Sequence, residues 1–130
     1  MTDLAKYRLE LATERVEVAA TMIADGRFRI SVTNSYYAMF NAVRALLAEI
    51  PTDFKKHSAV VSYFRREYVK TGLFEVKYSD YIGKAFTARQ YSDYGDFVVV
   101  SREEAEEQYQ HAVEFVAAIA AYLEALDENR

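Results

Sequence analysis

The stretch VTNSYYAMFNAVRALLAEI, residues 32–50, decides the fold class. Large apolar residues recur in it at spacings of three and four, and alanines occupy the adjacent positions, which is the pattern of a helix buried on most sides. The large apolar residues are Val32, Tyr36, Met39, Phe40, Val43, Leu46, Leu47 and Ile50. We expect this segment to be the most buried helix of the protein.

Four breaks divide the chain into five segments. Each break carries Gly, Pro or short polar residues, which stop helices and start turns. The breaks fall at residues 25–26, 50–53, 71–72 and 95–96. Because such short loops make consecutive helices antiparallel neighbours, the sequence predicts an all-α, up-and-down antiparallel bundle of about five helices. The length of 130 residues fits a single domain over residues 1–130.

The first and last segments are also amphipathic. In residues 4–24 the predicted apolar stripe consists of Leu4, Leu11, Val18 and Met22. The last segment opens with Ser101 followed three residues later by Glu104, which is the pattern of a capping box. Between the fourth and fifth segments, residues 97–100 read Phe-Val-Val-Val. Because β-branched residues are poor helix formers, we expect a short extended connector there and no sheet.

Composition narrows the class of protein. Hydrophobic residues make up 52% of the chain, with 4 Gly and 1 Pro, so the chain is neither a disordered segment nor a turn-rich β-sandwich. The absence of cysteine excludes a disulfide framework and a thiolate metal site and fits a reducing compartment. Residues 1–7 lack the apolar core of a signal peptide. No run approaches the roughly 20 apolar residues of a membrane span, so we expect a soluble, cytoplasmic protein.

The counts of histidine and glycine exclude several familiar cofactor sites. With 2 His and 4 Gly the chain carries no glycine-rich phosphate loop, no paired-histidine zinc motif and no EF-hand loop. A di-iron bundle needs Glu-x-x-His pairs, and the residue three positions before His111 is Gln108. We therefore expect neither a metal nor a cofactor.

The formal net charge of −4 is unevenly distributed. Acidic residues gather in the last predicted helix, whereas basic residues prevail between residues 53 and 73. A polyanion such as RNA would therefore first meet Lys55, Lys56, Arg65 and Arg66. The same charges also fit a solvated helix face, and the sequence leaves both interpretations open.

Polar residues crowd at the end of the predicted fourth helix, over residues 88–94. The inward stripe of that helix consists of Tyr78, Ile82 and Ala85. Continuing this stripe by four residues twice reaches Arg89 and then Asp93. An unpaired buried arginine is strongly destabilising, so Arg89 either pairs with Asp93 within the bundle or faces a wet cleft or a subunit interface.

Two histidines and many tyrosines remain as candidate functional groups. His57 shares the inward face of the predicted third helix with Val61, Phe64 and Tyr68. Such a histidine is either a core or capping residue satisfied by one hydrogen bond or a catalytic residue. His111 lies on the acidic last helix, where we expect it to face solvent. For most of the 11 tyrosines, helical spacing favours a place in the core over stacking on bases.

Three blocks of sequence carry a resemblance to a known family. They read SYYAMFNA at residues 35–42, KHS at 56–58 leading to FRREYVKTG at 64–72, and RQYSDY at 89–94. In this combination and order they resemble the small stand-alone HEPN domain proteins, and the similarity runs along nearly the whole chain. The resemblance implies a helical bundle that forms a homodimer, with a cleft between the subunits lined by the polar end of the fourth helix.

The resemblance also implies an activity and a partner. Many members of the family are metal-independent ribonucleases, often toxins encoded beside a small nucleotidyltransferase that acts as the antitoxin. Their catalytic signature is an Arg followed after four to six residues by a His. Arg89 supplies the first half of this signature, whereas the positions of the His are occupied by Tyr94, Gly95 and Asp96. The leading hypothesis is a toxin-like protein of this kind that acts on RNA or a nucleotide.

Chemistry assigns roles to the candidate catalytic residues. Cleavage of RNA through its own 2′-hydroxyl needs a group that exchanges protons near pH 7 and a cation that stabilises the charged phosphorane. Arg89 can supply the cation with Asp93 orienting it, and His57 is the candidate acid or base if it folds against the same cleft. In related toxins the nucleotidyltransferase adenylylates a tyrosine close to the signature, and Tyr94 or Tyr91 is the candidate counterpart here.

Other classes of function fit the same residues. Because the signature histidine is missing, the alternative hypothesis is a non-catalytic module in which Arg89, Asp93 and Tyr94 bind a nucleotide or lock a dimer. A third hypothesis is a helical adaptor with no nucleotide affinity.

Overall fold

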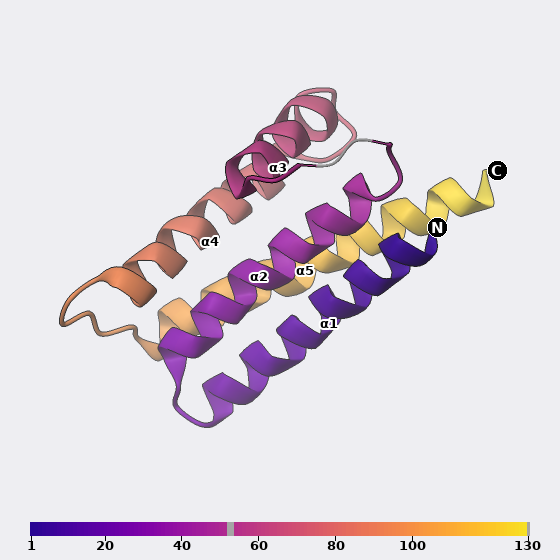
Figure 1. Ribbon diagram of the computed structural model, residues 1–130. Coiled ribbons are helices and arrows are strands. Elements are labelled where there is room, and N and C mark those ends of the chain that lie inside the picture. Colours follow the sequence, from indigo (N-terminus) through magenta and orange to yellow (C-terminus); the bar gives the residue numbers. More distant parts are fainter. Residues whose placement is uncertain (52–53, 130) are drawn as a thin grey trace.

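The computed structural model describes residues 1–51 and 54–129, and over these residues the chain forms five α-helices, one π-helical turn and no strand (Figure 1). The elements are α1 (Asp3–Ala24), α2 (Phe28–Leu47), α3 (His57–Phe64), η1 (Arg65–Val69), α4 (Val76–Tyr94) and α5 (Arg102–Glu128). The predicted all-α, up-and-down bundle is therefore confirmed. Thr52 and Asp53, which belong to the second predicted break, lie outside the described residues.

Helix α2 is the central element. It packs against α1, α4 and α5, and Figure 1 shows it running between α1 and α4 with α5 behind. Of its 20 residues 14 are buried, which confirms the prediction that this is the most buried helix. In the body of the helix only Thr33, Tyr37 and Arg44 are half-buried, and they lie along one stripe. This stripe is therefore the part of the body of α2 that is accessible to solvent.

Helix α1 buries a different stripe from the predicted one. Its buried residues are Ala5, Ala12, Ala19 and Ile23, whereas Leu4 is 47% exposed and the other three predicted residues are half-buried. The three alanines let the backbone of α1 approach α2 closely, so the larger side chains flank the contact instead of filling it. The amphipathic pattern is right, and the face is displaced by one residue.

The predicted end of α1 and the predicted start of α5 are confirmed, and the structure adds a cap at the start of α1 that was not predicted. The Thr2 hydroxyl accepts a hydrogen bond of 3.0 Å from the Ala5 N–H at the start of α1. At the start of α5 the Ser101 hydroxyl accepts one of 3.1 Å from the Glu104 N–H, and the Ser101 N–H donates to the Glu104 carboxylate, which completes the capping box. Gly26 ends the α1 region in the left-handed conformation, with φ of 75°.

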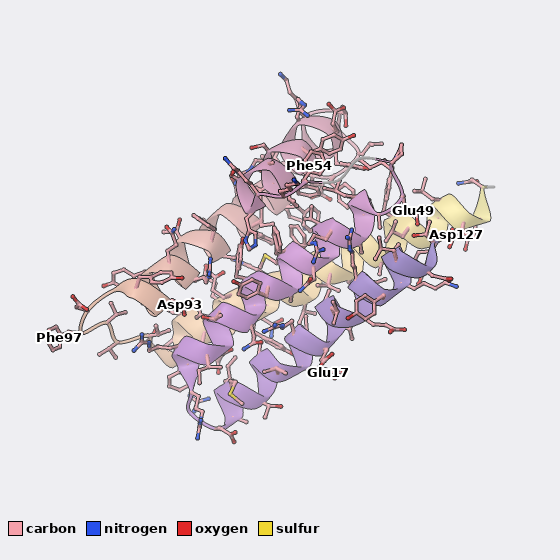
Figure 2. All side chains as sticks on the ribbon, in the orientation of Figure 1. Glu17, Glu49, Phe54, Asp93, Phe97 and Asp127 are labelled. Atoms are coloured by element: carbon pink, nitrogen blue, oxygen red, sulfur yellow. The ribbon has the colours of Figure 1, made fainter. Side chains whose placement is uncertain are left out.

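The connection between α4 and α5 contains no strand over residues 95–101, as predicted. Figure 2 shows the side chain of Phe97 extending away from the helices at the outer end of this connection. Phe97 is completely exposed and has φ of 59°, in the left-handed region, so the prediction of an extended connector is wrong at this residue. None of the described helices has the length and apolar character needed to cross a membrane.

The third predicted helix is divided into α3 and the wider turn η1. Phe64, the last residue of α3, is fully buried, and its ring centroid lies 5.6 Å from those of Phe74 and Phe115. This aromatic cluster anchors the far end of α3 to the core. The first residue of α3, His57, lies beside α2, and the His57 ring stacks on Phe40.

Candidate functional site

Arg89 lies in the last turns of α4 with its side chain only 16% exposed. Its Nε atom is 3.3 Å from Oδ2 of Asp93, so the predicted i,i+4 ion pair is present, although the two groups are not aligned as a hydrogen bond. The other carboxylate oxygen of Asp93 accepts a hydrogen bond of 2.7 Å from the Thr33 hydroxyl of α2. Figure 2 shows Asp93 at this end of α4, on the side of α2. Asp93 therefore connects α4 to the accessible stripe of α2.

Three tyrosine rings surround the Arg89 guanidinium. Its central carbon lies 5.5, 5.2 and 5.9 Å from the ring centroids of Tyr36, Tyr37 and Tyr94, which is within the range of cation–π contacts. Sequence reasoning assigned no site role to Tyr36 and Tyr37. Two sequence features together could have pointed to them. One is the pair of adjacent tyrosines in the most apolar predicted helix, and the other is the place of Arg89 on the inward stripe of the fourth predicted helix.

His57 contacts the same tyrosine as Arg89. Its ring stacks on Phe40 with centroids 4.1 Å apart, and its Nδ1 lies 3.4 Å from the Tyr36 hydroxyl. His57 was predicted to face inward, but the residue as a whole is exposed. Only the ring face that packs on Phe40 is directed to the core. The structure thus brings His57, Tyr36 and Arg89 together from α3, α2 and α4.

Burial and charge set the protonation of this group. The pKa of His57 is lowered from its ordinary value, first by partial burial and then by the cations Arg89 and Arg44. Burial raises the pKa of Tyr36, and Arg89 partly offsets the rise. At neutral pH the imidazole is therefore uncharged and able to accept a proton, while the Tyr36 hydroxyl stays protonated.

Tyr94 and Tyr91, the predicted candidates for modification, are both accessible. Tyr94 is 72% exposed although one face of its ring contacts Arg89, and Tyr91 is 63% exposed. Their accessibility is compatible with covalent modification, and that role stays a prediction.

The four basic residues predicted to meet a polyanion differ in their surroundings. Lys55 and Lys56 are exposed and immediately precede His57. Arg65 donates hydrogen bonds of 2.9 and 3.2 Å to the hydroxyl and carbonyl oxygens of Ser79, and Arg66 donates one of 2.9 Å to Glu67. The charge of Arg66 is thus partly neutralised. Whether these residues bind a polyanion stays a prediction.

A pocket of about 590 Å³ opens beside His57, between α3 and α4. Its lining consists of Tyr36, His57, Ser58, Val61, Ser62, Arg65, Ile82, Gly83 and Phe86. Sequence reasoning did not find this pocket, because its walls come from four elements, α2, α3, η1 and α4, whose relative positions are set by packing. In the described part of the chain no three His, Asp or Glu side chains are grouped so that they could hold a metal ion.

His111, which was expected to face solvent, is largely covered. Its side chain is 16% exposed, and its ring stacks on Tyr81 of α4 with centroids 4.0 Å apart. Burial lowers the pKa of His111, with Glu107 opposing the change. The prediction was wrong because the cover comes from α4, which the pattern of α5 alone does not reveal. The Tyr81 hydroxyl donates a hydrogen bond of 2.9 Å to Glu114 in the same cluster.

Comparison with known proteins places the chain in a family. The family model described as HEPN domain matches residues 5–123. A Methanocaldococcus jannaschii protein named "putative toxin" is 34% identical over 98 residues, which are 75% of this chain and 67% of that protein. A Thermotoga maritima protein named "UPF0332 protein" is 32% identical over 123 residues, or 95% of this chain and 93% of that protein. A second M. jannaschii protein with the same toxin name is 31% identical over 86 residues, covering 66% and 64% of the two chains.

Proposed function

Because this chain belongs to the HEPN domain family, we propose that it is a toxin-like, metal-independent endoribonuclease. One observation carries the proposal: Tyr36 contacts both His57, at 3.4 Å, and the guanidinium of Arg89, at 5.5 Å. A histidine and an arginine therefore contact the same tyrosine even though the sequence lacks an Arg-x4-6-His signature. These are the two residue types that cleavage through the 2′-hydroxyl requires.

In the proposed reaction His57 is the general base. Its neutral imidazole takes the proton of the 2′-hydroxyl, the 2′-oxygen forms a bond to phosphorus, and the bond from phosphorus to the 5′-oxygen breaks. A solvent water supplies the proton that the departing 5′-oxygen takes, and His57 returns its own proton to solvent, so no water is consumed. Arg89 binds the phosphate oxygens and stabilises the charge of the phosphorane. The products are a 2′,3′-cyclic phosphate and a 5′-hydroxyl.

The other polar residues support these two. Asp93 orients Arg89 through the 3.3 Å ion pair and is itself held by Thr33. Tyr94 contacts Arg89 with one face of its ring and presents the rest of its side chain to solvent, where it can bind substrate or accept a nucleotidyl group. Lys55 and Lys56, next to His57, attract the polyanion.

The toxin role and its partners form the second part of the proposal. The names of the two M. jannaschii relatives support the toxin role. A cytoplasmic location and a nucleotidyltransferase antitoxin are the further parts of this proposal, and they rest on the resemblance to the family. An exposed group of apolar side chains at the α4 end of the site supports a homodimer. The group consists of Phe97 and Val99, in the connection that follows α4. Covering such a group in a subunit interface removes apolar area from water and brings two copies of Arg89 to one cleft.

Cleavage of a mixed RNA pool in the presence of EDTA tests the activity. We expect the purified protein to cut RNA without metal and Arg89→Ala to lose activity by roughly a hundredfold or more, as for the loss of one group that stabilises transition-state charge. Arg102→Ala is the matched control, because its guanidinium pairs with Glu106 on the surface of α5 and has no assigned part in the site. No cutting by the folded wild-type protein would overturn the assignment.

A second candidate function is nucleotide binding without catalysis. It is favoured by the occupants of the signature histidine positions, Tyr94, Gly95 and Asp96, none of which is a histidine. In that case the Arg89 group holds a phosphate and His57 plays no chemical part. A protein that binds nucleotides through Arg89 but leaves RNA intact would support this function over the first.

A further inference from the structure

The pocket between α3 and α4 has one apolar side and one polar side. The apolar side is formed by Ile82, which is fully buried, by half-buried Val61 and by Phe86, which is 38% exposed. The ring of Phe86 lies edge-on to Tyr36, with centroids 5.9 Å apart and an interplanar angle of 61°. A flat apolar ligand therefore finds aromatic and aliphatic surface in this pocket.

The polar side comes from one face of α3 and η1. Ser58, Ser62 and Arg65 follow each other at spacings of four and three, so they lie in a row along the pocket. Neither serine hydroxyl has a hydrogen bond to another described residue. Arg65 uses two donors on Ser79 and keeps others available, since a guanidinium has five N–H groups. None of the nine lining residues is acidic, so the pocket suits a neutral or anionic ligand.

Gly83 keeps the pocket open. It lies within α4, where glycine is the poorest helix former after proline. A Cβ atom added at this position would lie 2.8 Å from Nη2 of Arg65, so any side chain would displace the guanidinium. The glycine thus lets Arg65 cross the face of α4 at the edge of the pocket.

The pocket adjoins the Arg89 site, because the two share the residue Tyr36. Tyr36 and His57 line the pocket, and the same Tyr36 ring contacts the guanidinium of Arg89. A planar ligand in the pocket that carries a phosphate can therefore have its ring against Phe86 and its phosphate directed towards Arg89. Hydroxyl groups, a neutral imidazole and a guanidinium supply both donors and acceptors for the edge of a heteroaromatic ring.

From these contacts we propose that the α3–α4 pocket is a nucleobase subsite that holds one unstacked base of a single-stranded RNA next to the phosphate bound by Arg89. The inference rests on the proposed function, because it takes RNA as the substrate. It adds the part of the site that recognises a base. Single-stranded RNA is the fitting substrate class, because its bases can leave the stack and enter a side pocket. Phe86 provides the ring surface, and Ser58, Ser62 and Arg65 contact the base edge.

Binding of mononucleotides to the full chain tests the subsite directly. Adenosine and uridine 5′-monophosphate are titrated separately and followed by amide NMR shifts, with ribose 5-phosphate as the probe that has the same anion and no base. We expect at least one of the two nucleotides to bind about tenfold or more tightly than ribose 5-phosphate, in line with the contribution of one stacked base. The largest shifts should fall at Ser58, Ser62 and Gly83. Equal binding of all three probes, or shifts confined to other residues, would overturn the proposal.

Variants that fill the pocket give a second test. Gly83→Leu introduces a side chain at the pocket wall, and Lys84→Leu introduces the same side chain on the same helix outside the pocket lining. We expect Gly83→Leu to weaken nucleotide binding about tenfold or more and Lys84→Leu to leave it unchanged. Ser62→Leu, on the exposed side of α3, fills the pocket from the other wall if Gly83→Leu does not fold. Undiminished binding in a folded pocket-filling variant contradicts the subsite.

The same variants separate this inference from the proposed ribonuclease activity. If the nucleotides bind in the pocket but RNA is not cut, the subsite stands and the ribonuclease assignment falls. If RNA is cut equally fast and at the same sites by wild-type protein and Gly83→Leu, the ribonuclease stands and the subsite falls.

Discussion

Asp93 controls the orientation of Arg89 at the scale of a single residue. One of its carboxylate oxygens faces Arg89 at 3.3 Å and the other accepts from Thr33 at 2.7 Å. In Asp93→Asn an amide oxygen can still accept from Thr33, but the charge that holds the guanidinium is lost. We expect RNA cleavage to fall about tenfold with the thermal stability nearly unchanged, because misplacing a catalytic group is costly. Asp96→Asn, which changes an exposed acid beyond the helix, is the control. Equal rates for the two variants would refute the positioning role.

His111 makes the stability depend on pH. Burial lowers its pKa below the ordinary value of 6.5. Between the lowered pKa and 6.5 the unfolded chain therefore binds more protons at this residue than the folded chain does, and stability decreases as the pH falls through that window. Melting temperatures measured from about pH 7.5 to about pH 5 should decrease for the wild type and decrease less for His111→Phe, which can still stack on Tyr81. An identical pH dependence in both proteins would contradict this.

For single residues, the sequence predicts contacts between side chains of the same helix, but it does not predict contacts with side chains of another helix. The Arg89–Asp93 pair could be predicted, because residues four apart on a helix are neighbours whatever surrounds them. The burial of His111 could not, because the ring that covers it belongs to α4. For the same reason the tyrosine rings of α2 around Arg89 were not foreseen.

At the scale of elements, the capping box fixes the start of α5. Ser101→Ala removes the hydroxyl that accepts from the Glu104 N–H at 3.1 Å. We expect the free energy of unfolding to decrease by about 1 kcal/mol, measured by urea denaturation. Ser101→Asp should retain most of the stability, since a carboxylate also caps a helix and favours its N-terminus. A loss as large in Ser101→Asp as in Ser101→Ala would show that capping is not the cause.

Most helix ends could be predicted from the sequence, because capping residues and glycines end a helix through residues that are close in the sequence. Ser101 and Gly26 mark ends that the structure confirms. The buried face of α1 was missed by one residue, since the choice between its alanines and its larger residues depends on how closely α2 approaches. The division of the third helix at Arg65 has no sequence signal that we can identify.

At the scale of the whole molecule, Phe64 joins α3 to the rest of the bundle. Its side chain is fully buried and contacts Tyr68, Phe74 and Phe115. Phe64→Ala should reduce the free energy of unfolding by about 3–5 kcal/mol, as for other aromatic-to-alanine changes in cores. Leu73→Ala, at a position 54% exposed, should change it by less than about 0.5 kcal/mol. Urea denaturation of both variants checks the difference, and similar small losses in both would mean that this cluster is not a central part of the core.

The antiparallel arrangement followed from short loops and amphipathic segments, so the topology could be predicted from the chain alone. The meeting of His57 with Arg89 could not, because it depends on where α3 packs along α2 and α4. Its determinants are the anchoring of Phe64 at one end of α3 and the stacking of His57 on Phe40 at the other. The pocket between α3 and α4 results from the same packing.

In the proposed reaction His57 supplies the proton transfer for which the signature position has no histidine. The most direct test is the rate at which His57→Ala cleaves RNA in EDTA, measured with and without added imidazole. We predict a loss of roughly a hundredfold or more, the usual contribution of a general base, with partial recovery when imidazole is added. Cleavage at the wild-type rate by His57→Ala would show that His57 is not the general base.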